Sequence, residues 1–332
     1  MKKSKILYVS PFPFYPPTTG GERAINAYVR SLAQKYFVIV CAPKSQKQIP
    51  YNDVEIYRFY KENKSKYFNI GAYWKIFQLV KKNKFESLVF AFPYQGYFCY
   101  LIAKLNRVPI KMHEHNIEFL RFKTLKKWWW PLMYLYEFFL YSFVDAIDSI
   151  SDSDRQLAIK YLKISPKKIS VIPYSADTTV FKSSPEAGKK IRGFLHLDHE
   201  KIVLFFGSLD YKPNQEAVEI IEKKIAPEIY KKNQNIKFLI VGRNPPKNIQ
   251  SPNIIFTGFV DKVEDYINAS DIVIVPLLSC GGIRTKILES LACGKKVIST
   301  KLGAEGITSV SNKNLVIIND ISKFSEKIED YL

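Results

Sequence analysis

The stretch KIVLFFGSLDYKPNQEAVEII (Lys201–Ile221) sets an apolar run, a glycine turn and a helix-forming segment one after another. Every residue of its opening KIVLFF except the lysine is apolar. Such uninterrupted runs are typical of parallel strands, because helices cover both faces of a parallel sheet. A helix is predicted over residues 214–224, directly after the turn. The stretch therefore predicts one strand-to-helix step of an α/β sheet.

The same step recurs along the whole chain. The other apolar runs are KILYV, FVIVCA, SLVFAF, VPIKM, AIDSI and KISVI in the first half and IKFLIVG, NIIFTG, DIVIVPL, KKVIST and NLVII in the second. The pattern pauses once, at the polar segment Asp177–Lys190. It predicts two doubly wound, Rossmann-like α/β domains, residues 1–183 and 184–332, which we expect to face each other across a cleft. The first helix is expected to begin near Glu22.

The composition is that of a globular protein with an unusual charge. Of the 332 residues, 47% are hydrophobic and 24% are charged, which excludes a disordered chain. The formal net charge of +19 favours polyanions, anionic lipid headgroups or phosphorylated small molecules as partners. The four cysteines lack C-x-x-C spacing, and the apolar run after the first methionine is too short for a signal peptide. We therefore expect a cytoplasmic protein without disulfides.

The most apolar segment is KKWWWPLMYLYEFFLYSFV (Lys126–Val144). A proline and a glutamate interrupt it, and it is shorter than the ~20 residues that span a bilayer. Two interpretations stay open: a buried helix of the first domain, or a basic helix lying in the membrane interface. The expected membrane contacts are then Trp128, Trp129 and Trp130. Different faces of one helix could serve both, and the second would place the protein peripherally on the inner face of an anionic membrane.

A second segment, SCGGIRTKILESLACGKK (Ser279–Lys296), predicts a glycine turn followed by a helix. The free N–H groups of a helix N-terminus attract anions, and a bound phosphate would offset the unfavourable position of Arg284 and Lys286 on the helix dipole. Glu289 lies one turn beyond Lys286, where its carboxylate could accept hydrogen bonds from sugar hydroxyls. The alternative is a solvated ion pair of Lys286 and Glu289 on an ordinary surface helix.

Several motifs in a fixed order resemble glycosyltransferase family 4, particularly its exopolysaccharide-associated sugar transferases. In the second half they are FFGSLDYKPNQEAVEII, FLIVGRNPP, IIFTGFVDKVEDYINASDIVIVPL, GGIRTKILESLACGKKVIST and GAEGI, which cover nearly all of residues 201–318. In the first half TTGGERAINAYVRSLAQ, HEHNIEFLR and DAIDSISDSDRQ are similar to the family's glycine loop, acceptor-side histidine and last strand and helix. The resemblance implies a GT-B fold, a UDP- or GDP-sugar donor, retention at the anomeric carbon, no metal or other cofactor, and a glycan, lipid-linked or protein acceptor.

The resemblance also implies roles for single residues. Glu289 matches the glutamate that binds the donor ribose, and Lys212 is the nearest match to the family's phosphate lysine. His115 matches the histidine at the reaction centre, which would orient the acceptor or sugar. The residues implied to lie against the donor are Gly20 and Gly21 in the first domain, Gly281, Gly282, Ile283, Arg284, Thr285 and Lys286 at the diphosphate, and Gly258, Phe259 and Val260 at the nucleobase. Arg284, Lys286 and Lys212 would stabilise the charge of the leaving diphosphate.

The sequence departs from the family pattern at three places. Gly281 stands where many members carry the first of two glutamates, and Ser208 stands where many have an arginine. The chain stops at Leu332, before the helix that usually crosses back to the first domain and bears on domain closure. These departures leave a catalytically silent nucleotide-sugar sensor as one alternative.

The net charge and the histidines raise two further possibilities. Charge alone allows a nucleic-acid-binding protein, but the basic residues form no stripe interleaved with stacking aromatics and no recognition motif appears. A zinc site is not expected at His113 and His115, because the H-E-H spacing is not the i, i+4 spacing of a helical pair. His196 and His199 are expected at the surface.

Overall fold

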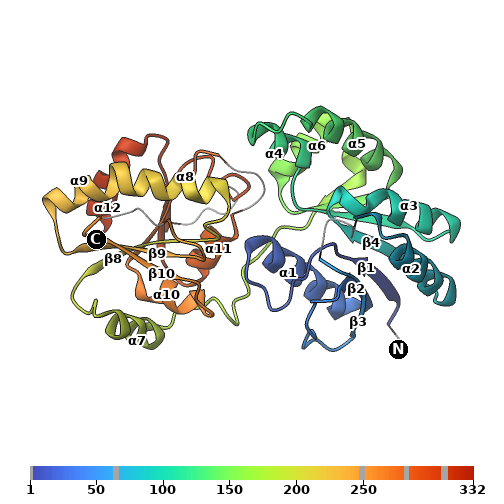
Figure 1. The fold of residues 1–332 in the computed structure, drawn as a ribbon, viewed down its shortest axis with the longest axis horizontal. Coiled ribbons are helices and arrows are strands. Elements are labelled where there is room, and N and C mark those ends of the chain that lie inside the picture. Colours follow the sequence, from blue (N-terminus) through green and yellow to red (C-terminus); the bar gives the residue numbers. More distant parts are fainter. Residues whose placement is uncertain (1–2, 63–66, 247–250, 280–283, 308–312) are drawn as a thin grey trace. The chain divides into compact units, whose positions relative to one another are not determined.

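The computed structural model describes residues 3–62, 67–246, 251–279, 284–307 and 313–332. The chain forms two compact α/β units, and the first ends at Tyr174 where the second begins at Ser175 (Figure 1). The predicted boundary at residues 183 and 184 lies within the stretch that leads into the first helix of the second unit. There the Asn268 side chain accepts a hydrogen bond from the Ser184 N–H and donates one to the Lys182 carbonyl, which ties this stretch to the second unit.

The described part of the first unit contains a seven-stranded parallel sheet with the order β3-β2-β1-β4-β5-β6-β7. Its strands are β1 (Lys5–Val9), β2 (Phe37–Pro43), β3 (Val54–Tyr60), β4 (Ser87–Ala91), β5 (Ile110–Glu114), β6 (Ala146–Ser149) and β7 (Ile169–Val171). Its helices are α1 (Gly20–Lys35), α2 (Ile70–Lys82), α3 (Gly96–Leu105), α4 (Glu118–Thr124), α5 (Trp130–Phe143) and α6 (Asp152–Leu162), with short η2 (Pro93–Gln95) and η3 (Pro166–Lys168). The predicted strands are confirmed, and α1 begins two residues before the expected Glu22.

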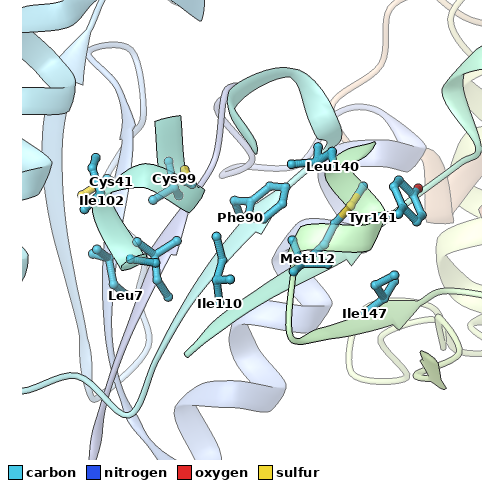
Figure 2. Packing of buried hydrophobic residues seen from close by; sticks show 14 of the residues in the cluster. Leu7, Cys41, Phe90, Cys99, Ile102, Ile110, Met112, Leu140, Tyr141 and Ile147 are labelled. Carbon is cyan, nitrogen blue, oxygen red and sulfur yellow. The ribbon is translucent and has the colours of Figure 1, made fainter. Parts of the chain in front are cut away.

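Alternate residues of the central strand β1 enter two different cores. Ile6 and Tyr8 pack with Ile25 and Val29 of α1. Leu7 and Val9 pack on the other face, where the buried residues of α2, α3 and α5 gather (Figure 2). Because successive side chains of a strand point to opposite faces, one apolar run supplies both cores. This double coverage explains why the strands are uninterrupted apolar runs.

The described part of the second unit contains a six-stranded parallel sheet with the order β10-β9-β8-β11-β12-β13. Its strands are β8 (Lys201–Phe206), β9 (Ile236–Val241), β10 (Ile254–Gly258), β11 (Ile272–Val275), β12 (Lys296–Ser299) and β13 (Leu315–Ile317). Its helices are α7 (Pro185–Leu195), α8 (Lys212–Ile220), α9 (Ala226–Lys232), α10 (Val263–Ala269), α11 (Thr285–Ala292) and α12 (Phe324–Tyr331), with η4 (Ile221–Ile225) and η5 (Ile321–Lys323). Helices α8, α9 and α12 lie on one side of this sheet, and α7 and α10 lie on the other (Figure 1).

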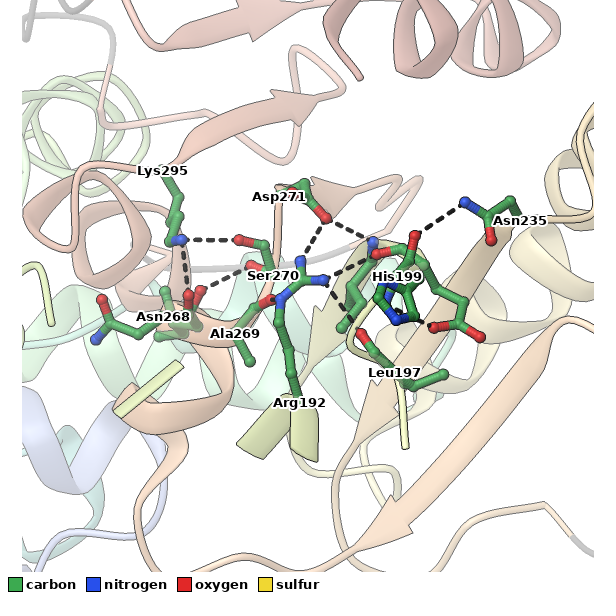
Figure 3. A network of polar contacts seen from close by, with 12 residues as sticks. Arg192, Leu197, His199, Asn235, Asn268, Ala269, Ser270, Asp271 and Lys295 are labelled. Atoms are coloured by element: carbon green, nitrogen blue, oxygen red, sulfur yellow. Dashed lines mark hydrogen bonds and ion pairs between the residues drawn. The ribbon is translucent and has the colours of Figure 1, made fainter. Parts of the chain in front are cut away.

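Helix α7 packs on α10, and one arginine near its C-terminal end ties it to the strands of the sheet. The Arg192 guanidinium donates to the carbonyls of Leu197, Glu200 and Ala269 and bonds the Asp271 carboxylate at 2.6 Å (Figure 3). Asp271 also accepts the N–H of Ile202 at the start of β8. The polar segment that was predicted as a pause between domains therefore contains a helix of the second unit. His196 and His199, which follow this helix, are exposed as predicted.

The Trp-rich segment has a buried face, as expected for a helix of the first domain, and an exposed face. Met133, Leu140 and Tyr141 of α5 are buried in the core, whereas Trp128 is 85% exposed. Trp129 and Trp130 are only partly buried, and Trp129 packs on Phe122 at a ring distance of 4.3 Å. In the described part of the chain, no helix has the length and apolarity to cross a membrane.

The packing of α7 on α10 can be tested with two glycine variants of α7, one of which is a matched control. A Cβ on Gly188 would lie 2.5 Å from the backbone oxygen of Asn268 in α10, whereas one on Gly193 would meet nothing closer than 3.9 Å. We expect Gly188→Ala to lower the free energy of unfolding by about 1–3 kcal/mol, because the backbone of α10 must move. Gly193→Ala should raise it by about 0.5–1 kcal/mol through helix propensity. Urea unfolding of the two variants checks this, and equal effects would contradict the close packing of α7 on α10.

Candidate functional site

The strand order of the second unit reverses between β8 and β11. From β8 the chain proceeds outward to β9 and β10, and it then returns to β11 on the other side of β8. The loops that follow β8 and β11 therefore leave the sheet in opposite directions. In open α/β sheets this switch point opens a crevice at the carboxyl ends of the strands, where ligands bind. Helices α8 and α11 begin on its two sides.

Lys286 of α11 reaches across this switch point. Its ammonium group donates a hydrogen bond of 3.0 Å to Oδ1 of Asn214 in α8, and it lies 4.3 Å from the ring centre of Phe205 in β8. The amide of Asn214 in turn donates to the Ser208 carbonyl at 2.7 Å. A cation is thus fixed beside the backbone turn that leaves β8. Lys286 was predicted to follow the Gly281–Gly282 turn, which lies outside the described residues, and its observed contacts are at the turn that leaves β8.

Glycines close the ends of three neighbouring strands beside that lysine. Gly207 follows β8 with a φ of +153°, Gly242 follows β9, and Gly258 ends β10 with a φ of +73°. A Cβ on Gly242 would lie 2.0 Å from the oxygen of Gly207, and one on Gly207 would lie 3.0 Å from the Lys286 ammonium. Only glycines permit these turns to pack so closely. The strand ends therefore present backbone, not side chains, around Lys286.

The first residues of α11 are buried. Arg284, which precedes the helix, and Thr285 and Glu289 within it are all nearly inaccessible to solvent. The alternative of a solvated ion pair between Lys286 and Glu289 is therefore wrong, because Glu289 is not on a solvated face. Gly281, Gly282 and Ile283, which were predicted to lie against the diphosphate, are outside the described residues.

The other predicted donor residues differ in their surroundings. The side chain of Lys212 is 67% exposed and pairs with Glu216 of the next turn at 3.9 Å, so Lys212 is not part of the Lys286 cluster. Glu216 also accepts a hydrogen bond from Ser279. Gly258 has open space around its Cβ position, and Phe259 beside it is exposed while Val260 is half-buried. Gly258 ends the edge strand β10, and Phe259 and Val260 follow it.

The first unit has its own switch point, between β1 and β4. Helix α1 begins at Gly20 behind the N-cap Thr19, whose side chain accepts the Glu22 N–H, and Glu22 reaches back to the N–H groups of Thr18 and Thr19. This capping box fixes the entry to α1. A Cβ on Gly21 would meet no atom within 4 Å, so the predicted glycine loop leaves open space at the helix start.

His115 follows β5 and is stacked on an aromatic ring. The ring of Phe92, which follows β4, lies parallel to it at 4.3 Å, and Phe12, which follows β1, meets Phe92 edge-on at 5.3 Å. Phe92 has φ +64° and ψ 153°, a backbone conformation nearly confined to glycine that costs about 1–3 kcal/mol. Its strained backbone places the ring against the imidazole.

Burial makes this histidine pair neutral. Burial lowers the pKa of His115 to about 3, and burial and the neighbouring imidazole hold the pKa of His113 well below its usual range. Nδ1 of His113 hydrogen bonds with the Tyr8 hydroxyl at 2.9 Å, and its ring stacks on Tyr28 at 3.7 Å. Nε2 of His115 is buried and has no hydrogen-bond partner among the described residues. His115 therefore offers a neutral, orienting group.

The sequence did not reveal some residues of these two sites. Phe92 gave no signal, because a phenylalanine at a strand end carries no mark of a positive φ. Asn214 was placed at the start of a predicted helix without a role. Asp148, which accepts a hydrogen bond from Tyr28 at 2.5 Å and pairs with Lys111 at 3.4 Å, looked like an ordinary strand residue. Only the register of β5 and β6, which sets His113 opposite Asp148, brings it to this edge.

Comparisons with known proteins agree on one family and fold. A model described as Glycosyltransferase Family 4 matches residues 18–180, and one described as Glycosyl transferases group 1 matches residues 200–332. One relative is an Escherichia coli UDP-Gal:alpha-D-GlcNAc-diphosphoundecaprenol alpha-1,3-galactosyltransferase, which is 23% identical over 77% of this chain. The match spans 66% of that relative's own length, which is just under two thirds. An uncharacterized glycosyltransferase of Methanocaldococcus jannaschii is 25% identical over 97% of this chain and 87% of its own.

The solved structures support the same fold. Anabaena HepE, crystallised with UDP and glucose, superimposes with a TM-score of 0.73 at 16% identity, over 98% of this chain and 89% of that one. The predicted fold class, GT-B with two Rossmann-like domains, is confirmed.

Glu114, between the two histidines, gives a testable dependence of stability on pH. Its carboxylate accepts the Tyr141 hydroxyl at 2.9 Å, and burial raises its pKa to about 8. The folded state then holds a proton that the unfolded state releases near pH 4.3, so stability falls as pH rises between these values, by roughly 1.4 kcal/mol per unit. The low pKa values of His113 and His115 act oppositely, removing stability as pH falls below about 6.5.

The comparison of wild type with Glu114→Gln isolates the carboxyl group, because both proteins share the histidines. We expect the variant to gain stability relative to wild type as pH rises from 5 to 8 in urea unfolding. A difference that does not change with pH would show that Glu114 is ionised in the fold.

Proposed function

Because the chain belongs to glycosyltransferase family 4, with a group 1 transferase second half, we propose that it moves a glycosyl group from a UDP- or GDP-sugar to an acceptor hydroxyl. The acceptor would be a glycan, a lipid-linked sugar or a protein. The single observation that carries the donor side is Lys286, fixed by Asn214 beside the glycine turn at the switch point. Neither nucleic-acid binding nor a silent sensor gains support from this geometry.

The donor diphosphate would lie at the β8–β11 switch point. There the Lys286 ammonium and the N-terminus of α11 supply positive charge. The buried carboxylate of Glu289 suits ribose hydroxyls, which need an acceptor. The nucleobase would lie at Gly258 to Val260, with exposed Phe259 as a stacking partner. UDP is the favoured nucleotide, since the E. coli relative is named for UDP-Gal and HepE was solved with UDP.

We propose transfer with retention and without a metal ion. The bond between the anomeric carbon and the diphosphate oxygen breaks, and the acceptor oxygen bonds to the same face. The acceptor proton passes to the leaving diphosphate, whose new charge Lys286 and Arg284 would stabilise. Lys212 contributes less in this account, because solvent screens its exposed ammonium group.

His115 would orient the acceptor or the sugar as a neutral imidazole. Its low pKa leaves it uncharged at every physiological pH, and Phe92 fixes its ring plane. A fixed neutral imidazole offers one donor and one acceptor nitrogen, which suits binding of a hydroxyl. An essential base that titrates near neutrality is not needed in this mechanism.

We further propose that the acceptor is carried on a lipid at the inner face of a membrane. The E. coli relative is named for an acceptor linked to diphosphoundecaprenol. A net charge of +19 favours an anionic membrane surface over a neutral one. The protein would then be peripheral.

Titration with UDP and GDP tests the donor site. Lys286→Ala should weaken binding of the preferred nucleotide about tenfold or more and lower kcat/KM roughly 100-fold, because a preorganised cation is lost. Glu289→Gln keeps the side-chain shape but removes its charge, and it should also weaken nucleotide binding and lower kcat/KM. The control is Lys223→Ala in η4, which removes a lysine whose ammonium group pairs with Glu219 at 3.6 Å. Equal effects of Lys286→Ala and Lys223→Ala would contradict the proposed site.

Turnover in excess EDTA tests the metal-free mechanism. We expect transfer from the preferred nucleotide sugar to proceed within about twofold of the rate with Mg²⁺, because protein cations stabilise the leaving group. Proton NMR of the product should show the anomeric configuration of the donor. Loss of turnover that Mg²⁺ restores, or an inverted product, would overturn this mechanism.

A further inference from the structure

An apolar surface covers three neighbouring helices of the first unit. Ten large hydrophobic side chains there are each between 44% and 85% exposed, and only four others are as accessible elsewhere in the described chain. The ten are Phe68, Ile70, Trp74, Leu101, Leu105, Trp128, Leu132, Leu135, Phe139 and Phe143. Contiguous exposed patches of this kind mark interaction sites in soluble proteins. We call these ten residues the α2–α3–α5 face.

The α5 part of this face is a continuous stripe. Leu132, Leu135, Phe139 and Phe143 follow one another at spacings of three, four and four residues, and the exposed Trp128 lies in the turn two residues before the helix. Side chains at these spacings lie on the same side of a helix. The buried residues Met133, Leu140 and Tyr141 occupy the opposite side, which packs on the sheet. Helix α5 is therefore apolar on both sides, and one of them is uncovered.

Ring contacts join the three helices into one layer. Phe143 of α5 stacks on Tyr100 of α3 at 5.2 Å, next to the exposed Leu101. Tyr73 of α2 stacks on Phe98 of α3 at 4.2 Å, next to the exposed Trp74. The helices lie side by side on the same face of the sheet (Figure 1). The exposed residues thus lie on or beside three helices that pack against one another.

The exposed charged residues of α2, α3 and α5 are all lysines. Within α2, α3 and α5 the only carboxylate is Glu137, which is buried and accepts the N–H groups of Glu118 and Phe119. Exposed basic residues border the apolar side chains. They are Lys75, Lys81, Lys82, Lys104, Lys123, Lys126 and Lys127. Lys123 lies 4.9 Å from the ring of Trp130, with its charged end near an amphipathic ring.

We propose that the α2–α3–α5 face docks on the surface of a bilayer rich in anionic phospholipid. Apolar side chains would enter the boundary between headgroups and acyl chains, while the bordering lysines meet the headgroup phosphates. A second copy of the chain fits less well, because it would bring an identical positive border against the first. This face differs from the predicted contact through Trp128, Trp129 and Trp130. It includes Trp128, whereas Trp129 and Trp130 pack partly on the core.

Flotation of the full chain with vesicles tests this surface without any sugar donor. We expect binding to vesicles of phosphatidylcholine and phosphatidylglycerol, and little binding to phosphatidylcholine alone. Leu135→Ser/Phe139→Ser should weaken partitioning by about tenfold or more, because the apolar contact is lost. The matched control is Phe194→Ser, which removes an exposed aromatic side chain of α7.

The charge is tested separately. Lys126→Glu/Lys127→Glu should lower binding to anionic vesicles by at least about 30-fold. Lys189→Glu/Lys190→Glu changes an exposed lysine pair of α7 equally and should have little effect. Equal losses in both pairs would reduce the binding to non-specific adsorption and overturn the proposal, as would equal binding to neutral vesicles.

Sedimentation of the protein without lipid tests the competing partner. A dimer that Leu135→Ser/Phe139→Ser abolishes would assign the face to a second copy and overturn membrane docking. The inference extends the proposed membrane location but does not depend on transfer. If the protein transfers sugar to a soluble acceptor but does not bind vesicles, membrane docking through this face is rejected and the proposed reaction stands. If it binds vesicles but shows no transfer, the proposed reaction is rejected and the docking surface stands.

Discussion

The reversal of strand order within each parallel sheet is the constraint on which both candidate sites depend. At the reversal, the connections after two adjacent strands diverge, so their carboxyl ends cannot be covered by the same helix. In the second unit this leaves room for Lys286 and Asn214 to meet from α11 and α8. In the first unit it brings the residues after β1 and β4, Phe12 and Phe92, together beside His115. Side chains that could bind a ligand meet at the reversal because no helix covers these strand ends.

Local sequence predicted the strands well because burial on both faces demands apolar runs. It missed β3, whose VEIYRFY alternates and lies at the sheet edge with partly exposed side chains. It also missed α7, because proline, glycines and lysines give the sequence of that helix a polar appearance. For the site, the pattern located Lys286 and His115, but long-range contacts decide their surroundings. The burial of Glu289, the exposure of Lys212 and the strain at Phe92 depend on residues far away in the chain.

The two units treat charge in opposite ways at their strand ends. The first unit buries His113, His115 and Glu114, and burial favours the neutral form of each. The second unit keeps the ammonium group of Lys286 partly accessible, against an amide oxygen and an aromatic ring that both favour a cation. One unit thus offers hydrogen bonds without net charge, and the other offers a fixed positive charge. Such a division suits an acceptor hydroxyl and a diphosphate respectively.

The attachment of α7 determines where the two halves of such enzymes can be exchanged. The Arg192 guanidinium joins the chain before β8 to Asp271 beside β11, and Asn268 holds residues 182–184. A chimera joined at the start of β8 would combine a foreign α7 with this sheet and leave Asp271 without its arginine. A junction before Asp177 would transfer the helix together with the sheet that it covers. For joining another first unit to this second unit, the junction therefore belongs upstream of the polar segment.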